Sequence, residues 1–135
     1  MRASGTFTVT SFVPTDLVQD PPIVTGLPVG VARLEKAFSG QVEGRSATMF
    51  TAAFDQATGV GTYVAMESFE GSIDGRSGSF NFAHCATTHG SDRAAEFFTI
   101  VPSSGTGELA TITGTGGLRV DDDGTHHLWF EYELS

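Results

Sequence analysis

Residues 63–86 read YVAMESFEGSIDGRSGSFNFAHCA, and apolar and polar side chains alternate on both sides of the central run Asp74-Gly75-Arg76-Ser77. Alternation with a period of two is typical of a β-strand that buries one face. A glycine between two such runs supplies the backbone geometry of a tight two-residue turn. The stretch therefore predicts a β-hairpin, and we expect the rest of the chain to form a scaffold around it.

The hairpin brings two ionisable side chains, Glu67 and His84, to one face of the sheet. If Gly75-Arg76 forms the loop, Glu67 lies directly opposite His84. If Asp74-Gly75 forms the loop, Ala65 lies opposite His84, and Glu67 is one diagonal position away. Only a shift by an odd number of residues, such as a β-bulge, would separate the pair. Both two-residue loops therefore predict that the two side chains are neighbours.

The size and cysteine content of the chain indicate one reduced domain. The chain has 135 residues, and residues 1–135 are expected to form a single domain with a core of its own. The single cysteine, Cys85, excludes an intramolecular disulfide, and the first residues lack the features of a signal peptide. We therefore expect a cytoplasmic protein. No apolar run approaches the roughly 20 residues of a membrane-spanning helix, so no membrane is expected as a partner.

Composition points to an acidic all-β protein. Seven basic and sixteen acidic residues give a formal net charge of -9, which phosphate backbones and anionic lipids would repel. Nucleic acid is therefore not an expected partner, and we interpret the acidity as serving solubility. Seventeen glycines and eleven phenylalanines, with few leucines and lysines, favour strands over helices.

Alternation along the chain predicts about eight strands, over residues 2–13, 31–38, 46–54, 60–69, 79–87, 93–101, 115–120 and 125–134. Residues 14–30 hold four of the five prolines and lose this period, so we expect a long loop there, with a lid as one interpretation. Residues 108–112 could form one helical turn. The strand over residues 93–101 is apolar on both faces near its end, as in a strand covered on both sides.

Short turns between sequential strands favour an up-and-down antiparallel β-barrel. A repeated pattern supports this topology: FSGQVEGRS over residues 38–46 recurs in kind as FEGSIDGRS over residues 69–77. Glycine interrupts the strand pattern in both copies, and closed sheets need such bends. Eight strands enclose a space that side chains fill or that one small ligand occupies.

Three groups of residues carry a resemblance to a known family: Phe38-Ser39-Gly40, the run from Glu67 to Phe80 with His84 after it, and VPSSGTGEL over residues 101–109. They resemble a bacterial domain-of-unknown-function family, number 3224, whose fold is similar to the allene oxide cyclase barrel. The resemblance spans residues 5–132 and places the family's glutamate at Glu67 and its histidine at His84. It carries no established activity. In allene oxide cyclase the barrel encloses an apolar pocket where a few polar groups, a glutamate among them, steer a cyclisation without a cofactor.

Glu67 and His84 are the candidate catalytic residues, with the glutamate as base or charge stabiliser and the histidine as its acid partner. The same face carries the candidate walls of a ligand site: Tyr63, Phe69, Phe80 and Phe82. We expect a small, largely apolar ligand, no cofactor, and cyclase or isomerase chemistry if the protein is an enzyme. The pair could instead be a buried ion pair that only fixes register.

A second class of function stays open, a non-catalytic binding or assembly protein whose barrel is filled by its own phenylalanines. A homo-oligomer is compatible with the sequence. No metal site is expected, because His126 and His127 point to opposite faces of a strand and Asp121-Asp122-Asp123-Gly124 lacks the spacing of a calcium loop. Cys85 lies on the face opposite His84, so the two do not form a nucleophile pair.

Overall fold

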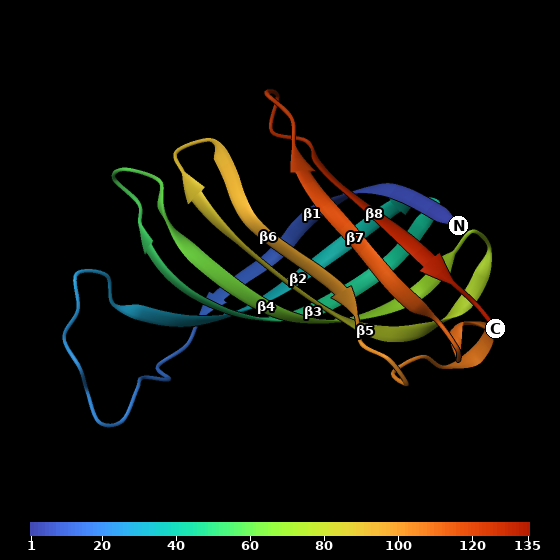
Figure 1. Cartoon of the computed structure of the whole chain (residues 1–135), viewed down its shortest axis with the longest axis horizontal. Helices are drawn as coiled ribbons and strands as arrows, with labels where there is room; N and C mark the ends of the chain where they lie inside the picture. Colours follow the sequence, from blue (N-terminus) through green and yellow to red (C-terminus); the bar gives the residue numbers. More distant parts are fainter.

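Eight antiparallel strands close into a barrel in which each strand pairs with its neighbour in sequence, and the last strand pairs with the first (Figure 1). The structure is a computed structural model and describes all residues, 1–135. The all-β barrel of about eight strands is thereby confirmed. The strands are β1 (Arg2–Pro14), β2 (Val29–Gly40), β3 (Val42–Asp55), β4 (Val60–Ile73), β5 (Arg76–His89), β6 (Asp92–Ile100), β7 (Thr113–Val120) and β8 (His126–Glu133).

The central hairpin adopts the second of the two predicted registers. Asp74 and Gly75 form the turn, with φ angles of 51° and 80°, as a tight turn between twisted strands requires. Ala65 therefore pairs with His84, and Glu67 pairs with Phe82. The glutamate and the histidine share the inner face of the barrel and lie one diagonal apart.

Two β-bulges change which side chains point inward. Thr10 is the extra residue of a bulge in β1, so Phe12, instead of Ser11, joins Phe7 and Val9 on the inner face. A second bulge between β5 and β6 includes Ala95, whose φ is 51°. The expectation that the end of β6 is covered on both faces is wrong, because Phe97 is 54% exposed on the outer face.

Glycines of the repeated pattern lie where the backbones of β3 and β4 leave no room for a side chain. Gly44 pairs with Gly71, and their φ angles are 146° and 153°. A Cβ atom added to Gly71 would lie 2.0 Å from the carbonyl oxygen of Glu43. Any larger side chain would push the two strands apart, so these glycines permit the tight closure of this end.

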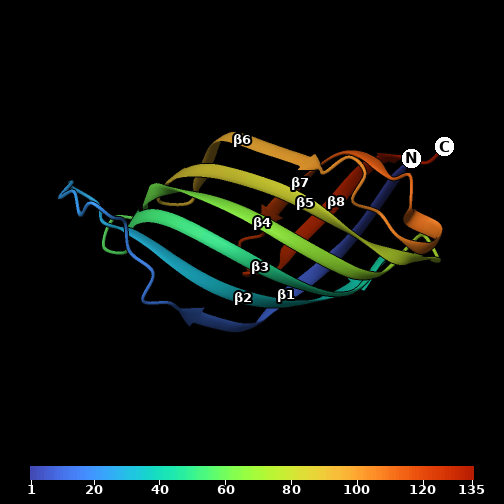
Figure 2. The same cartoon turned by 90° about the horizontal axis from the view of Figure 1, so that it is seen from below.

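The two ends of the barrel differ. At the end that carries both termini (Figure 1), a cluster of apolar side chains fills the interior. The cluster includes Leu109, from the 3₁₀ helix Gly107–Leu109, and Ile112, which follows it. This short helix overlaps the helical turn predicted over residues 108–112 and begins one residue earlier. The opposite end carries the loop over residues 15–28, which projects away from the barrel in both views (Figures 1 and 2). No helix of the structure has the length and apolar character needed to cross a membrane.

Candidate functional site

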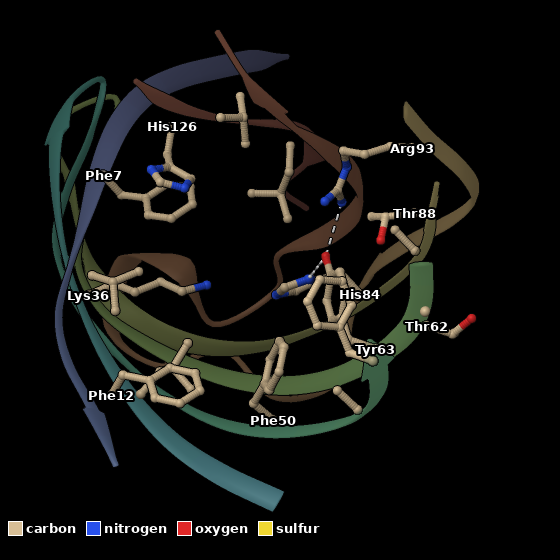
Figure 3. A pocket seen from close by; sticks show the side chains of 18 of the residues that line it. Phe7, Phe12, Lys36, Phe50, Thr62, Tyr63, His84, Thr88, Arg93 and His126 are labelled. Atoms are coloured by element: carbon tan, nitrogen blue, oxygen red, sulfur yellow. Dashed lines mark hydrogen bonds between the residues drawn. The ribbon is translucent and has the colours of Figure 1, made fainter. Parts of the chain in front are cut away.

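A cavity of about 390 Å³ opens at the loop-bearing end of the barrel, within the range of small-molecule sites (Figure 3). Its walls come from all eight strands, and they are mostly apolar. The residues that line it are Phe7, Val9, Phe12, Leu34, Lys36, Phe50, Ala52, Phe54, Gln56, Gly61, Thr62, Tyr63, His84, Ala86, Thr88, Arg93, Leu118, Arg119, Val120 and His126.

Glu67 and His84 meet at the floor of this cavity. His84 Nε2 lies 2.9 Å from Glu67 Oε1, and the side chains are 4% and 0% exposed. The predicted proximity of the two residues is thus present. His84 lines the cavity, whereas the carboxylate of Glu67 lies below the surface of the floor.

Two further residues hold the carboxylate of Glu67. Lys36 Nζ donates to Glu67 Oε1 at 2.9 Å, and Ser46 Oγ donates to Glu67 Oε2. Lys36 is only 6% exposed, so this is a buried ion pair. We did not anticipate either partner from the sequence. One signal was available for the lysine, since it is the only lysine of the chain and alternates with the apolar residues Leu34 and Phe38.

Tyr63 and Arg93 continue these hydrogen bonds from His84 along the cavity wall toward the rim, and we call the series Arg93–Tyr63–His84–Glu67 the polar chain. The Tyr63 hydroxyl lies 2.9 Å from His84 Nδ1, and Arg93 Nη2 donates to the same hydroxyl at 3.0 Å (Figure 3). Arg93 also pairs with Glu96 near the rim. A continuous series of hydrogen bonds therefore runs from the rim of the cavity to the buried carboxylate.

Burial and charge fix the protonation states of Glu67, His84 and Tyr63. Burial works to raise the pKa of Glu67, but the hydrogen bond with His84 and the Lys36 ammonium outweigh it, so the pKa lies below its ordinary value. Burial lowers the pKa of His84 against the opposing effect of Glu67. Burial likewise raises the pKa of Tyr63 in spite of Arg93. At neutral pH Glu67 is therefore a carboxylate, His84 a neutral imidazole and Tyr63 a neutral phenol.

These states leave one arrangement of protons. A carboxylate only accepts hydrogen bonds, so His84 carries its proton on Nε2 and donates it to Glu67. His84 Nδ1 then accepts from the Tyr63 hydroxyl, whose oxygen accepts from Arg93. Each group is oriented by the next one, as in a nucleophile or base that is held by a histidine and a carboxylate.

The predicted ligand-binding residues divide into two groups. Tyr63 lines the cavity, as the prediction requires. The other three, Phe69, Phe80 and Phe82, lie in the apolar cluster below the floor, at most 2% exposed, and do not line the cavity. These three residues were predicted as walls of the ligand site, and the structure corrects this. The barrel is filled with side chains at their level and is hollow only above His84.

The polar chain does not include Cys85, Asp121, His126 or His127. Cys85 points away from the cavity and is partly buried. Asp121 pairs with Arg119 and His127 on the outside of the β7–β8 hairpin. His126 reaches the cavity wall, with its ring 5.0 Å from that of Phe7. No three histidine, cysteine or acidic side chains are grouped as a metal ion would require.

Comparison with known proteins supports the fold assignment. A crystal structure of a protein of unknown function from the DUF3224 family of Shewanella oneidensis MR-1 is similar over 100% of this chain and 98% of its own, with a TM-score of 0.82 and 28% sequence identity. No curated protein matches the chain. The likeness to allene oxide cyclase stays a prediction. The family model described as "Protein of unknown function (DUF3224)" matches residues 3–132, and the chain therefore belongs to this family.

Proposed function

We propose that the barrel binds a small, largely apolar molecule in its cavity. We propose further that it acts as a cofactor-free isomerase or cyclase, in which Tyr63 takes protons from the bound molecule and returns them to it. The observation that carries the proposal is the series of hydrogen bonds that links Tyr63, at the wall of a mostly apolar cavity, through His84 to Glu67. A phenol so oriented is a suitable acid or base, because its proton has a defined acceptor.

The proposed step conserves protons. Tyr63 passes its hydroxyl proton to His84 Nδ1 while its oxygen takes a proton from a carbon atom of the ligand. The carboxylate of Glu67 stabilises the imidazolium that forms, and Arg93 stabilises charge on the phenol oxygen. Return of a proton through the same oxygen to a second atom of the ligand completes an isomerisation. The net reaction needs no cofactor.

Binding can be tested with a neutral fluorescent probe, N-phenyl-1-naphthylamine, whose emission rises in apolar surroundings. We expect the wild-type protein to bind it and Ala52→Phe to lose binding, since Ala52 lines the cavity. Ala53→Phe is the matched control, because the next residue along β3 points to the outer face. Absence of binding to the wild type, or equal binding by both variants, would contradict the proposal.

Chemistry can be tested once the ligand is identified by native mass spectrometry of protein purified from its host. Tyr63→Phe removes only the hydroxyl, and we expect turnover of that ligand to fall by at least about 100-fold, the contribution of a positioned acid or base. Glu67→Gln should lower turnover as well, because it removes the charge that stabilises the imidazolium. Unchanged turnover in Tyr63→Phe would remove the proton-transfer proposal.

A non-catalytic carrier is the second candidate, and one observation favours it. The Tyr63 hydroxyl already donates to His84 and accepts from Arg93, so the group that would exchange protons with a ligand is engaged within the protein. A retained ligand that leaves the protein unchanged after long incubation would favour the carrier. Conversion of that ligand to an isomer would favour the enzyme.

A further inference from the structure

The charges that line the cavity are opposite to those of the protein as a whole. The chain has sixteen acidic and seven basic residues, yet the cavity lining includes Lys36, Arg93 and Arg119 and no aspartate or glutamate. Surface charges are screened in salt water within about 8 Å at physiological ionic strength, whereas charges inside an apolar cavity are screened much less. A ligand in the cavity therefore experiences the local cations more than the net negative charge.

Two of these cations have donors directed at the open space. Arg93 uses Nε for Glu96 and Nη2 for Tyr63, and Nη1 has no partner in the protein. Lys36 Nζ makes one hydrogen bond, to Glu67, and lies 4.9 Å from the centre of the Phe7 ring. Both side chains point into the cavity in Figure 3. Arg119 contributes less, because it lies at the rim, is largely exposed and pairs with Asp121.

The three charged groups inside the barrel at the cavity, Lys36, Arg93 and Glu67, sum to one excess positive charge, and Glu96 pairs with Arg93 from the rim, outside the cavity lining. Glu67 neutralises one of the two inward cations, Lys36 and Arg93, while Glu96 beside the arginine is half exposed and in contact with solvent. One anionic group on a ligand would balance the remaining charge. Arginine also offers a planar fork that fits the two oxygens of a carboxylate.

We propose that the ligand is an amphipathic monoanion, an apolar body with one carboxylate-like group that binds Arg93 from inside the cavity. The apolar body packs on the aromatic and aliphatic wall, and Lys36 adds a second donor at the floor. This inference rests on the proposed binding function and names the class of its ligand. It predicts selection by charge among molecules of the same shape.

Three competitors with one ring system test the selection: 2-naphthoate, 2-naphthylmethanol and 2-naphthylmethylammonium, each displacing N-phenyl-1-naphthylamine. We expect naphthoate to displace the probe at a concentration about tenfold or more below that of the alcohol, as a charge-assisted hydrogen bond implies. The ammonium compound should be the weakest. Equal potency of anion and alcohol, or a stronger alcohol, would overturn the inference.

Variants locate the effect. Arg93→Met should abolish the preference for naphthoate, measured as the ratio of naphthoate to alcohol potency within the variant, whereas Arg45→Met removes the same charge from the outer face and should keep the preference. Arg93→Lys should retain part of it. A preference that survives in Arg93→Met overturns the assignment to this residue. If the wild type does not bind the neutral probe at all, the proposed function fails; if it binds the probe without charge preference, only this inference fails.

Discussion

Replacement of Glu67 by glutamine is the most informative change to the barrel, because it removes one charge from a buried pair and keeps the shape of the side chain. In Glu67→Gln the Lys36 ammonium, 6% exposed, loses its counter-charge. Removal of one partner of a buried ion pair typically costs about 3–5 kcal/mol. The glutamine oxygen can still accept from the lysine, so we expect the low end, about 3 kcal/mol.

The assay is urea denaturation followed by the fluorescence of Trp129, the only tryptophan. A change in the transition midpoint with an unchanged slope reports a change in stability alone. Glu70→Gln is the matched control, because it lies three residues further along β4, faces outward and pairs with Arg45 in an exposed ion pair. We expect little effect there, since exposed pairs are screened by water.

A second variant separates the buried charge from other effects of the substitution. Lys36→Met combined with Glu67→Gln removes both charges and should recover much of the lost stability, because neutral replacements of buried pairs are often tolerated. The reasoning is refuted if Glu67→Gln is as stable as Glu70→Gln. It is also refuted if the double variant is no more stable than Glu67→Gln alone.

Three further predictions concern pH, an unpaired hydroxyl and the long loop. Burial holds the pKa of His84 below its ordinary 6.5, so just below that pH the unfolded protein binds more protons than the folded protein. The free energy of unfolding should therefore fall as the pH drops from 6.5 through the folded-state pKa of His84. In His84→Gln the urea midpoint should fall less between pH 7 and pH 5 than it does in the wild type. Thr48 has a buried hydroxyl without a partner, so Thr48→Val should raise stability by about 1 kcal/mol in the same assay, and a loss would contradict this. Replacement of residues 17–26 by two glycines should leave the thermal midpoint unchanged, because the apolar side chains of this loop are exposed; a clear decrease in calorimetry would show that the loop packs on the barrel.

The fold was predictable because local rules agree along the chain. Alternation of apolar and polar residues gave the strands, and the turn chemistry limited the central hairpin to two registers. Both registers keep Glu67 and His84 on one face, so their proximity did not depend on which loop forms. The structure selects Asp74-Gly75, where both turn residues adopt positive φ.

Arg93 was missed because of a β-bulge. Strict alternation places it with Phe97 on the outer face of β6. The bulge that includes Ala95 inserts one residue, and Arg93 then points inward, opposite Thr88. Lys36 was missed for another reason, since its contact with Glu67 spans two strand boundaries and exists only after the sheet curves. Contacts of this kind follow from closure of the barrel and have no local sequence signal.

The position of the cavity follows from the size of inward-facing side chains along β5. From the closed end to the open end these residues are Phe80, Phe82, His84, Ala86 and Thr88, a series that passes from large aromatic to small. The barrel is packed where the series is aromatic and hollow where it is small. His84 stands at the boundary, and its ring is stacked against Phe82 and Phe98 at 5.7 Å in each case.

This boundary position explains how one histidine can be both fixed and available. The packed aromatic layer desolvates the ring and so lowers its pKa, which keeps it neutral at physiological pH. Glu67, anchored by Lys36 and Ser46, determines which nitrogen carries the proton. The other nitrogen then faces Tyr63 at the wall of the cavity. Were the aromatic layer one residue pair higher, the ring would be buried away from any ligand; one pair lower, water would surround it and its neutral state would no longer be favoured.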